Sequence, residues 1–197
     1  MNKNLLLLLT LFVGFARNAQ NTQSFSKSSL IIDGNPLDIT GVSGGLGTFN
    51  CNTTIGFETV AKQCGTCNVS SASMAFRVYK IGETPGDFIA ISAPFASETT
   101  AGNCKSRTFR NDDIKSLLLQ NLKNGDYNLE IYFQSNGEGC DIINLQSVTY
   151  STTFTYAKEP TIVFQPIDLI SCTGGDAFFK TSATGVGALT YRWQMSD

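Results

Sequence analysis

The sequence predicts an all-β protein whose main unit is a Greek-key β-sandwich. Short segments in which apolar and polar residues alternate recur along the chain, and clusters of Gly, Asn, Asp and Pro separate them. One of these segments begins with a Leu-x-x-Gly-x-Tyr motif, which is typical of a corner in Greek-key sandwiches. Many short strands at such spacing predict a sandwich or a barrel.

The expected elements follow from these alternating segments. Between 127 and 133, for example, Tyr127, Leu129, Ile131 and Phe133 share one face of a strand. A turn is expected at 33–36, a glycine-rich loop at 41–47 and another turn at 82–86. In chain order, strands are expected at 24–33, 37–40, 54–60, 74–81, 88–91, 127–133 and 148–156.

One segment, 114–119, fits either a helical turn or a strand. Asn111 or Asp112 is a candidate cap for the helical alternative, and Asn124-Gly125 ends the segment.

The motif that follows, made of Leu122, Gly125 and Tyr127, has the spacing of a tyrosine corner. In such a corner the tyrosine hydroxyl bonds to the backbone a few residues upstream. The alternative is a plain Asn-Gly hairpin turn before a strand.

Composition excludes several classes of function. Only 15% of the 197 residues are charged, compared with about 25% in an average domain. The net charge is −2, so a basic, nucleic-acid-binding surface is not expected. The sequence has no histidine, which excludes Ser-His-Asp and Cys-His catalysis and every His-ligated metal site. We therefore expect no enzymatic activity, no cofactor and no metal.

The N-terminus has the features of an export signal. Lys3 precedes an apolar run at 5–16, which is shorter than the ~20 residues that span a bilayer. Small residues allow cleavage after Ala16 or after Ala19. We predict a signal peptide at 1–19 and a secreted or extracellular cell-surface protein. A membrane anchor is the alternative, and no transmembrane segment is expected in the mature chain.

The cysteines fit an oxidising compartment, where disulfides are the default. The candidates in the first unit are Cys51, Cys64, Cys67, Cys104 and Cys140. Because five thiols cannot all pair with one another, one is free or pairs with Cys172, and the connectivity is open. Cys64 and Cys67 form a C-x-x-C motif, which is also found in zinc sites and redox pairs. No second C-x-x-C and no histidine accompany it, and the residues after it are turn-like.

A joint at 157–160 separates the first unit from a second one. In the second unit, Cys172, Trp193 and an alternation of Tyr191, Trp193 and Met195 resemble the first half of a bacterial immunoglobulin-like domain. The resemblance implies a core around Cys172 and Trp193. The later Tyr-x-Cys of such domains is absent, so residues 158–197 are expected to be an incomplete immunoglobulin-like sandwich. A genuine C-terminal tail is the alternative.

The first unit, 20–157, is also similar to a known kind of module. The motifs at 76–79, 82–88, 117–122 and 125–132 resemble an N-terminal β-sandwich module of secreted, multi-domain surface proteins of gliding bacteria. The resemblance implies that immunoglobulin-like repeats and a sorting domain follow, and it brings no catalytic residues.

These observations predict a non-catalytic module that acts in adhesion, spacing or partner binding. The expected partner is a protein or a polysaccharide at the cell surface. Tyr79, Phe109 and Tyr132 are candidates for a ligand platform, although core packing is the alternative for aromatic residues. A glycosidase needs two carboxylates, and nothing marks a partner for Glu130. The alternative function is an accessory, glycan-binding module of a secreted hydrolase whose catalytic domain lies beyond residue 197.

Overall fold

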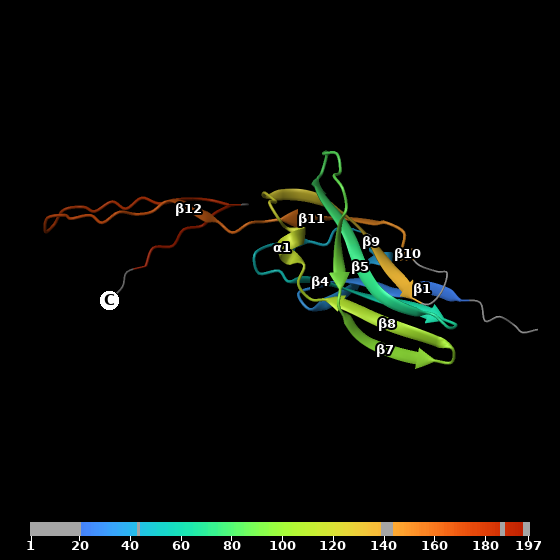
Figure 1. The fold of residues 1–197 in the computed structure, drawn as a ribbon. Coiled ribbons are helices and arrows are strands. Elements are labelled where there is room, and N and C mark those ends of the chain that lie inside the picture. Colours follow the sequence, from blue (N-terminus) through green and yellow to red (C-terminus); the bar gives the residue numbers. More distant parts are fainter. Residues whose placement is uncertain (1–20, 43, 139–143, 186–187, 195–197) are drawn as a thin grey trace, which may run out of the picture.

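Two β-sheets packed face to face make up the main body of the protein, and the predicted all-β sandwich is confirmed (Figure 1). The computed structural model describes residues 21–42, 44–138, 144–185 and 188–194. The expected signal peptide therefore lies outside the described residues.

The first sheet has five strands within the described residues, and every neighbouring pair is antiparallel. Strand β1 pairs with β2 through the turn that was predicted at 33–36. Across the sheet the order is β2 (Asn35–Asp38), β1 (Thr22–Ile32), β4 (Ile55–Cys64), β8 (Cys104–Asn111) and β7 (Phe95–Ala101).

The second sheet has six strands within the described residues. Five of them form its main path, and the sixth, β10 (Asn144–Gln146), pairs with β9. The contact between β3 and β11 is parallel, and the other pairs are antiparallel. Along the main path of hydrogen-bonded strands, the order is β3 (Thr48–Phe49), β11 (Tyr150–Tyr156), β9 (Gly125–Glu138), β5 (Asn68–Lys80) and β6 (Ile89–Ala93).

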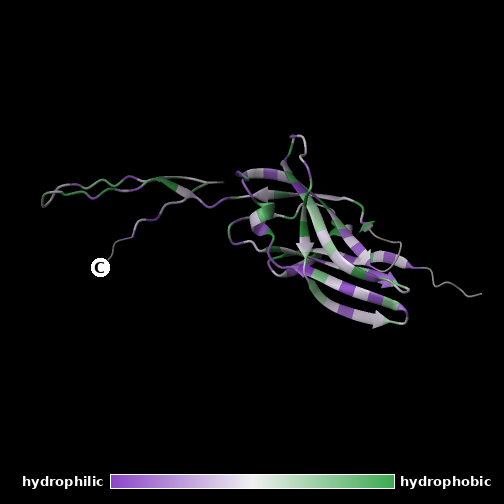
Figure 2. Cartoon of the chain, in the orientation of Figure 1, coloured by the Kyte–Doolittle hydropathy of each residue, from purple (hydrophilic) through white to green (hydrophobic). Residues whose placement is uncertain are grey.

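Hydrophobic and hydrophilic residues alternate along the strands (Figure 2). The apolar side chains of this alternation form the core between the two sheets. Phe57 of β4 and Phe133 of β9 meet across this layer, with ring centroids 6.0 Å apart. Leu129 and Ile131, which the sequence placed on the face of Phe133, are buried as well. The residues of β9 that alternate with these three therefore lie on the outer surface of the sandwich.

Several elements differ from the sequence-based expectation. Strands β7 and β8 occupy a region where no strand was expected, because Ser, Thr and charged residues hide the alternation there. Every residue of β7 is exposed, as an edge strand allows.

The segment at 114–119 contains the short helix α1 (Lys115–Leu118). Its first backbone N–H group, that of Lys115, donates to Asp113 and not to Asn111 or Asp112. A short 3-10 helix, η1 (Ile39–Gly41), follows β2.

The segment after residue 160 forms only a two-stranded hairpin among the described residues, with β12 (Thr161–Phe164) and β13 (Ser182–Thr184). Figure 1 shows it extending away from the sandwich. The expected core around Cys172 and Trp193 is not formed among the described residues, since Cys172 is exposed and Trp193 is 57% exposed. Two short strands cannot enclose a core between two layers.

Candidate functional site

The outer face of the six-stranded sheet carries a cluster of charged and aromatic side chains. The residues of β5 and β9 that alternate with the core residues supply Arg77, Tyr79, Glu130 and Tyr132. Arg77 lies directly opposite Glu130 in the register, so the backbone pairing alone brings these two side chains together.

Glu130 is held by two neighbours from β5. The carboxylate accepts a hydrogen bond of 2.8 Å from Nε of Arg77 and lies 2.6 Å from Nη2 of the same guanidinium. Its other oxygen accepts a 2.7 Å hydrogen bond from the Tyr79 hydroxyl. The two charged side chains are 26% and 16% exposed, so solvent screens this ion pair only in part.

Two aromatic rings extend this cluster. Phe88, in the loop before β6, lies 4.9 Å from the ring of Tyr132, and the two planes are tilted by 60°. The guanidinium of Arg77 lies 4.4 Å from the centroid of Phe88, which is a cation–π contact. Ala75 lies opposite Tyr132 in the register and is buried although it points outward. Arg77, Phe88, Glu130, Tyr132 and Tyr79 are called the outer-face cluster below.

The contacts of Glu130 set its ionisation. The hydrogen bond from Tyr79, helped by Arg77, lowers the pKa of the Glu130 carboxyl below its usual value. The same hydrogen bond raises the pKa of the Tyr79 hydroxyl. A catalytic acid needs a raised pKa to keep its proton at neutral pH, so the environment of Glu130 suits a permanently charged structural carboxylate.

This environment predicts that acid weakens the protein through Glu130. A lowered pKa in the folded state adds stability above the unfolded pKa of about 4.3, and that stability is lost as the pH falls through the folded-state pKa. In Glu130→Gln, we expect the free energy of unfolding to fall by about 1–2 kcal/mol at pH 7. We also expect the free energy of unfolding of this variant to depend less on pH than that of the wild type below about pH 5.

Urea denaturation of both proteins at a series of pH values measures these differences. Glu138→Gln, which removes an exposed carboxylate with no ion pair in the described part of the chain, is the matched control. An identical pH dependence in wild type and Glu130→Gln contradicts the prediction.

The expected ligand platform is corrected by this arrangement. Tyr79 and Tyr132 do lie on one outer face, but Phe109 belongs to β8 of the other sheet and is 1% exposed within the core. The aromatic neighbour of Tyr132 is Phe88, which was not among the residues predicted for the platform. Phe88 comes from the loop after the turn at 82–86, and no strand periodicity predicted which way its ring would point.

The tyrosine-corner residues lie at the start of β9. The Tyr127 hydroxyl donates to the carbonyl of Lys123 over 2.7 Å and accepts from the N–H group of the same residue over 3.1 Å. Gly125 has a φ of +151°, a backbone conformation that side chains disfavour, and Leu122 packs against the core. The polypeptide therefore turns sharply into β9 at this end of the sheet.

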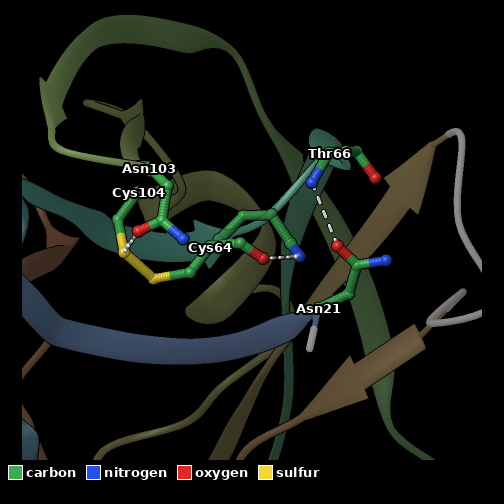
Figure 3. The surroundings of a disulfide bond; sticks show 6 residues. Asn21, Cys64, Thr66, Asn103 and Cys104 are labelled. Atoms are coloured by element: carbon green, nitrogen blue, oxygen red, sulfur yellow. Dashed lines mark hydrogen bonds between the residues drawn. A yellow bond between two sulfur atoms is a disulfide. The ribbon is translucent and has the colours of Figure 1, made fainter. Parts of the chain in front are cut away.

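A disulfide joins Cys64 and Cys104, which lie opposite each other at the ends of β4 and β8 (Figure 3). Cys67 is disulfide-bonded as well. Because Cys64 is bonded to Cys104, the C-x-x-C motif is not closed on itself as a redox pair. Disulfides of this kind fit an oxidising compartment.

The other candidate cysteines have different environments. Cys51 is an exposed free thiol whose Sγ donates to Glu159, and this contact raises the pKa of the thiol. Cys172 is also free and exposed, and Cys140 lies outside the described residues. Cys51 thus fits the odd thiol that was expected in the first unit.

No protein-family model matches the chain, and no curated protein matches it either. Within the part of the chain that the structure describes, no helix has the length and apolar character needed to cross a membrane. The outer-face cluster and the composition of the chain are therefore the features that bear on its function.

Proposed function

We propose that the chain is a non-catalytic module of a secreted or cell-surface protein, acting in adhesion, spacing or partner binding. Its binding surface in this proposal is the outer face of the six-stranded sheet. The observation that carries the proposal is the pair of rings of Phe88 and Tyr132, which lie on the solvent side of a strand pair. A rigid sheet that holds aromatic side chains toward solvent is suited to binding.

The state of Glu130 supports a non-catalytic role. Its carboxylate forms an ion pair with Arg77 and accepts a hydrogen bond from Tyr79. The lowered pKa of this carboxyl disfavours proton donation at neutral pH. The absence of histidine from the sequence supports the same reading.

A glycan-binding accessory module is the second candidate, and the two rings favour it. Sugars pack their apolar C–H faces on aromatic rings, while neighbouring polar groups bind the hydroxyls. Tyr132 combines an aromatic ring with a hydroxyl, and the polar groups of Tyr79 and Glu130 lie on the same face.

Retention of the protein in native gels that contain soluble polysaccharides tests the proposed surface. We expect Tyr132→Ala and Phe88→Ala to lower the retention about tenfold or more, since losing one buried aromatic contact typically weakens binding to that extent. Tyr191→Ala is the matched control, because Tyr191 is 53% exposed and lies outside the sandwich.

Unchanged retention in both variants of the outer-face cluster overturns the proposed surface. Turnover of the same polysaccharides by the wild type, lost in Glu130→Gln, overturns the non-catalytic role. If none of the polysaccharides retains the wild-type protein, the glycan-binding function is ruled out.

A further inference from the structure

A hollow of about 370 Å³ lies beside the outer-face cluster, at the end of the sheet where the tyrosine corner is found. Its walls come from the end of β5 and from the loop between α1 and β9. Tyr79 lines this hollow and also belongs to the outer-face cluster, so the two features meet at this residue. Lys80, the next residue, alternates with Tyr79 and lies on the other side of β5, at the end of the strand. The volume lies within the range of small-ligand sites, about 300–1,000 Å³.

The hollow carries two lysines with no acidic partner. Lys80 and Lys123 both line it, and neither forms an ion pair within the described residues. By contrast, Arg77, Arg107 and Lys27 of the sandwich are each paired with a glutamate. Unpaired cations that line one concave surface attract an anionic ligand.

Hydrogen bonds hold the backbone around both lysines. Tyr127 makes two hydrogen bonds to the backbone of Lys123, and the N–H group of Glu83 donates to the carbonyl of Lys80 over 3.0 Å. Asn121, which also lines the hollow, has a φ of +60°, a conformation that asparagine tolerates. The backbone of both lysines is therefore already ordered, so ligand binding has to order only their side chains.

Glu83 is the acidic residue of this lining. With two lysines and one glutamate, the lining has a net charge of about +1 on a chain whose net charge is −2. The hollow is thus a local exception to the charge of the whole protein. The carboxylate of Glu83 is expected to oppose the binding of an anion.

The aromatic rings suggest what kind of anion fits. Tyr79 and Tyr132 are placed four residues apart along paired strands, or about 13 Å. A chain of sugars that packs on Phe88 and Tyr132 reaches the hollow when it continues along the strands past Tyr79 and bends around the end of β5 toward Lys80. A lone phosphate or acetate leaves these rings without a contact, whereas an acidic polysaccharide uses both features.

We propose that Lys80 and Lys123 bind the carboxylate or sulfate group of an acidic polysaccharide that also packs on Phe88 and Tyr132. This inference rests on the proposed binding surface and adds the chemical class of its ligand. Carboxylate and sulfate share the anionic chemistry that the lysines recognise, and experiment separates them.

Three polymers with one backbone test the inference: dextran, carboxymethyl-dextran and dextran sulfate. We expect the full chain to bind one or both charged polymers more tightly than dextran, with an affinity that falls as salt is added. Lys80→Gln/Lys123→Gln is expected to weaken that binding about three- to thirtyfold. Glu83→Gln is expected to strengthen it, because it removes the opposing charge. The better of the two charged polymers identifies the anionic group.

Lys62→Gln/Lys180→Gln is the matched control, since it removes the same charge from exposed lysines outside the hollow that have no ion pair in the described part of the chain. Equal losses in the two double variants overturn the inference, because binding is then a property of net charge. Wild-type protein that binds the charged polymers no better than dextran also overturns it. In either case, the effect of Tyr132→Ala on retention still decides the proposed surface separately. Thermal unfolding of each variant verifies that it is folded.

Discussion

Replacing Phe133 with alanine is expected to lower the free energy of unfolding by about 3–5 kcal/mol. Phe133 is fully buried at the centre of the sandwich, where its ring lies 6.0 Å from Phe57 and 6.4 Å from Phe25. Both neighbours come from the opposite sheet. Alanine therefore removes contacts that join the two layers and leaves a cavity that rigid strands cannot close.

Urea denaturation followed by circular dichroism measures this loss. Phe178→Ala is the matched control, because Phe178 is 83% exposed in the segment after the sandwich, and we expect a change within about 0.5 kcal/mol. Phe133→Leu is expected to be intermediate. Equal effects of the Phe133→Ala and Phe178→Ala substitutions contradict the core that the structure shows.

Removing the disulfide with Cys64→Ser/Cys104→Ser is expected to lower the free energy of unfolding by about 2–4 kcal/mol. The bond closes a loop between residues 40 positions apart, so its loss increases the conformational freedom of the unfolded chain. It also joins the ends of β4 and β8 directly, in the middle of the five-stranded sheet.

Denaturation without reductant measures this effect, and Cys51→Ser is the control, since Cys51 is an exposed free thiol. We expect the control to change stability by less than about 0.5 kcal/mol. With reductant present, the wild type is expected to become at least as unstable as the double variant, because reductant also breaks the disulfide of Cys67. A wild type that reductant leaves unchanged, together with a fully stable double variant, contradicts a structural role for the bond.

Strands whose two faces differ in polarity were predictable from the sequence. The alternation at 127–133 identifies the inward face of β9, and the structure buries those residues. Strand β7 was not predictable in this way, because all of its residues are exposed and its sequence carries no inward face. Strand β8 was missed for a related reason, since only Phe109 of its residues is buried.

The candidate site was predictable only in part. Period-two alternation places Tyr79 and Tyr132 on outward faces, but alternation within a strand does not identify the neighbouring strand. The assignment of Phe109 to the platform was wrong because Phe109 belongs to the opposite sheet and points into the core. Phe88 was missed because it lies in a loop, where no repeating pattern fixes the direction of a side chain.

The sequence by itself determined the all-β class and the inward face of its clearest strand, because the side-chain period of a strand is a local property. It also excluded histidine chemistry by composition alone. Only the tertiary structure decided that Arg77 meets Glu130, that Phe88 meets Tyr132 and that Cys64 bonds to Cys104. These contacts depend on strand order and register, which are set by burying one whole sheet against the other.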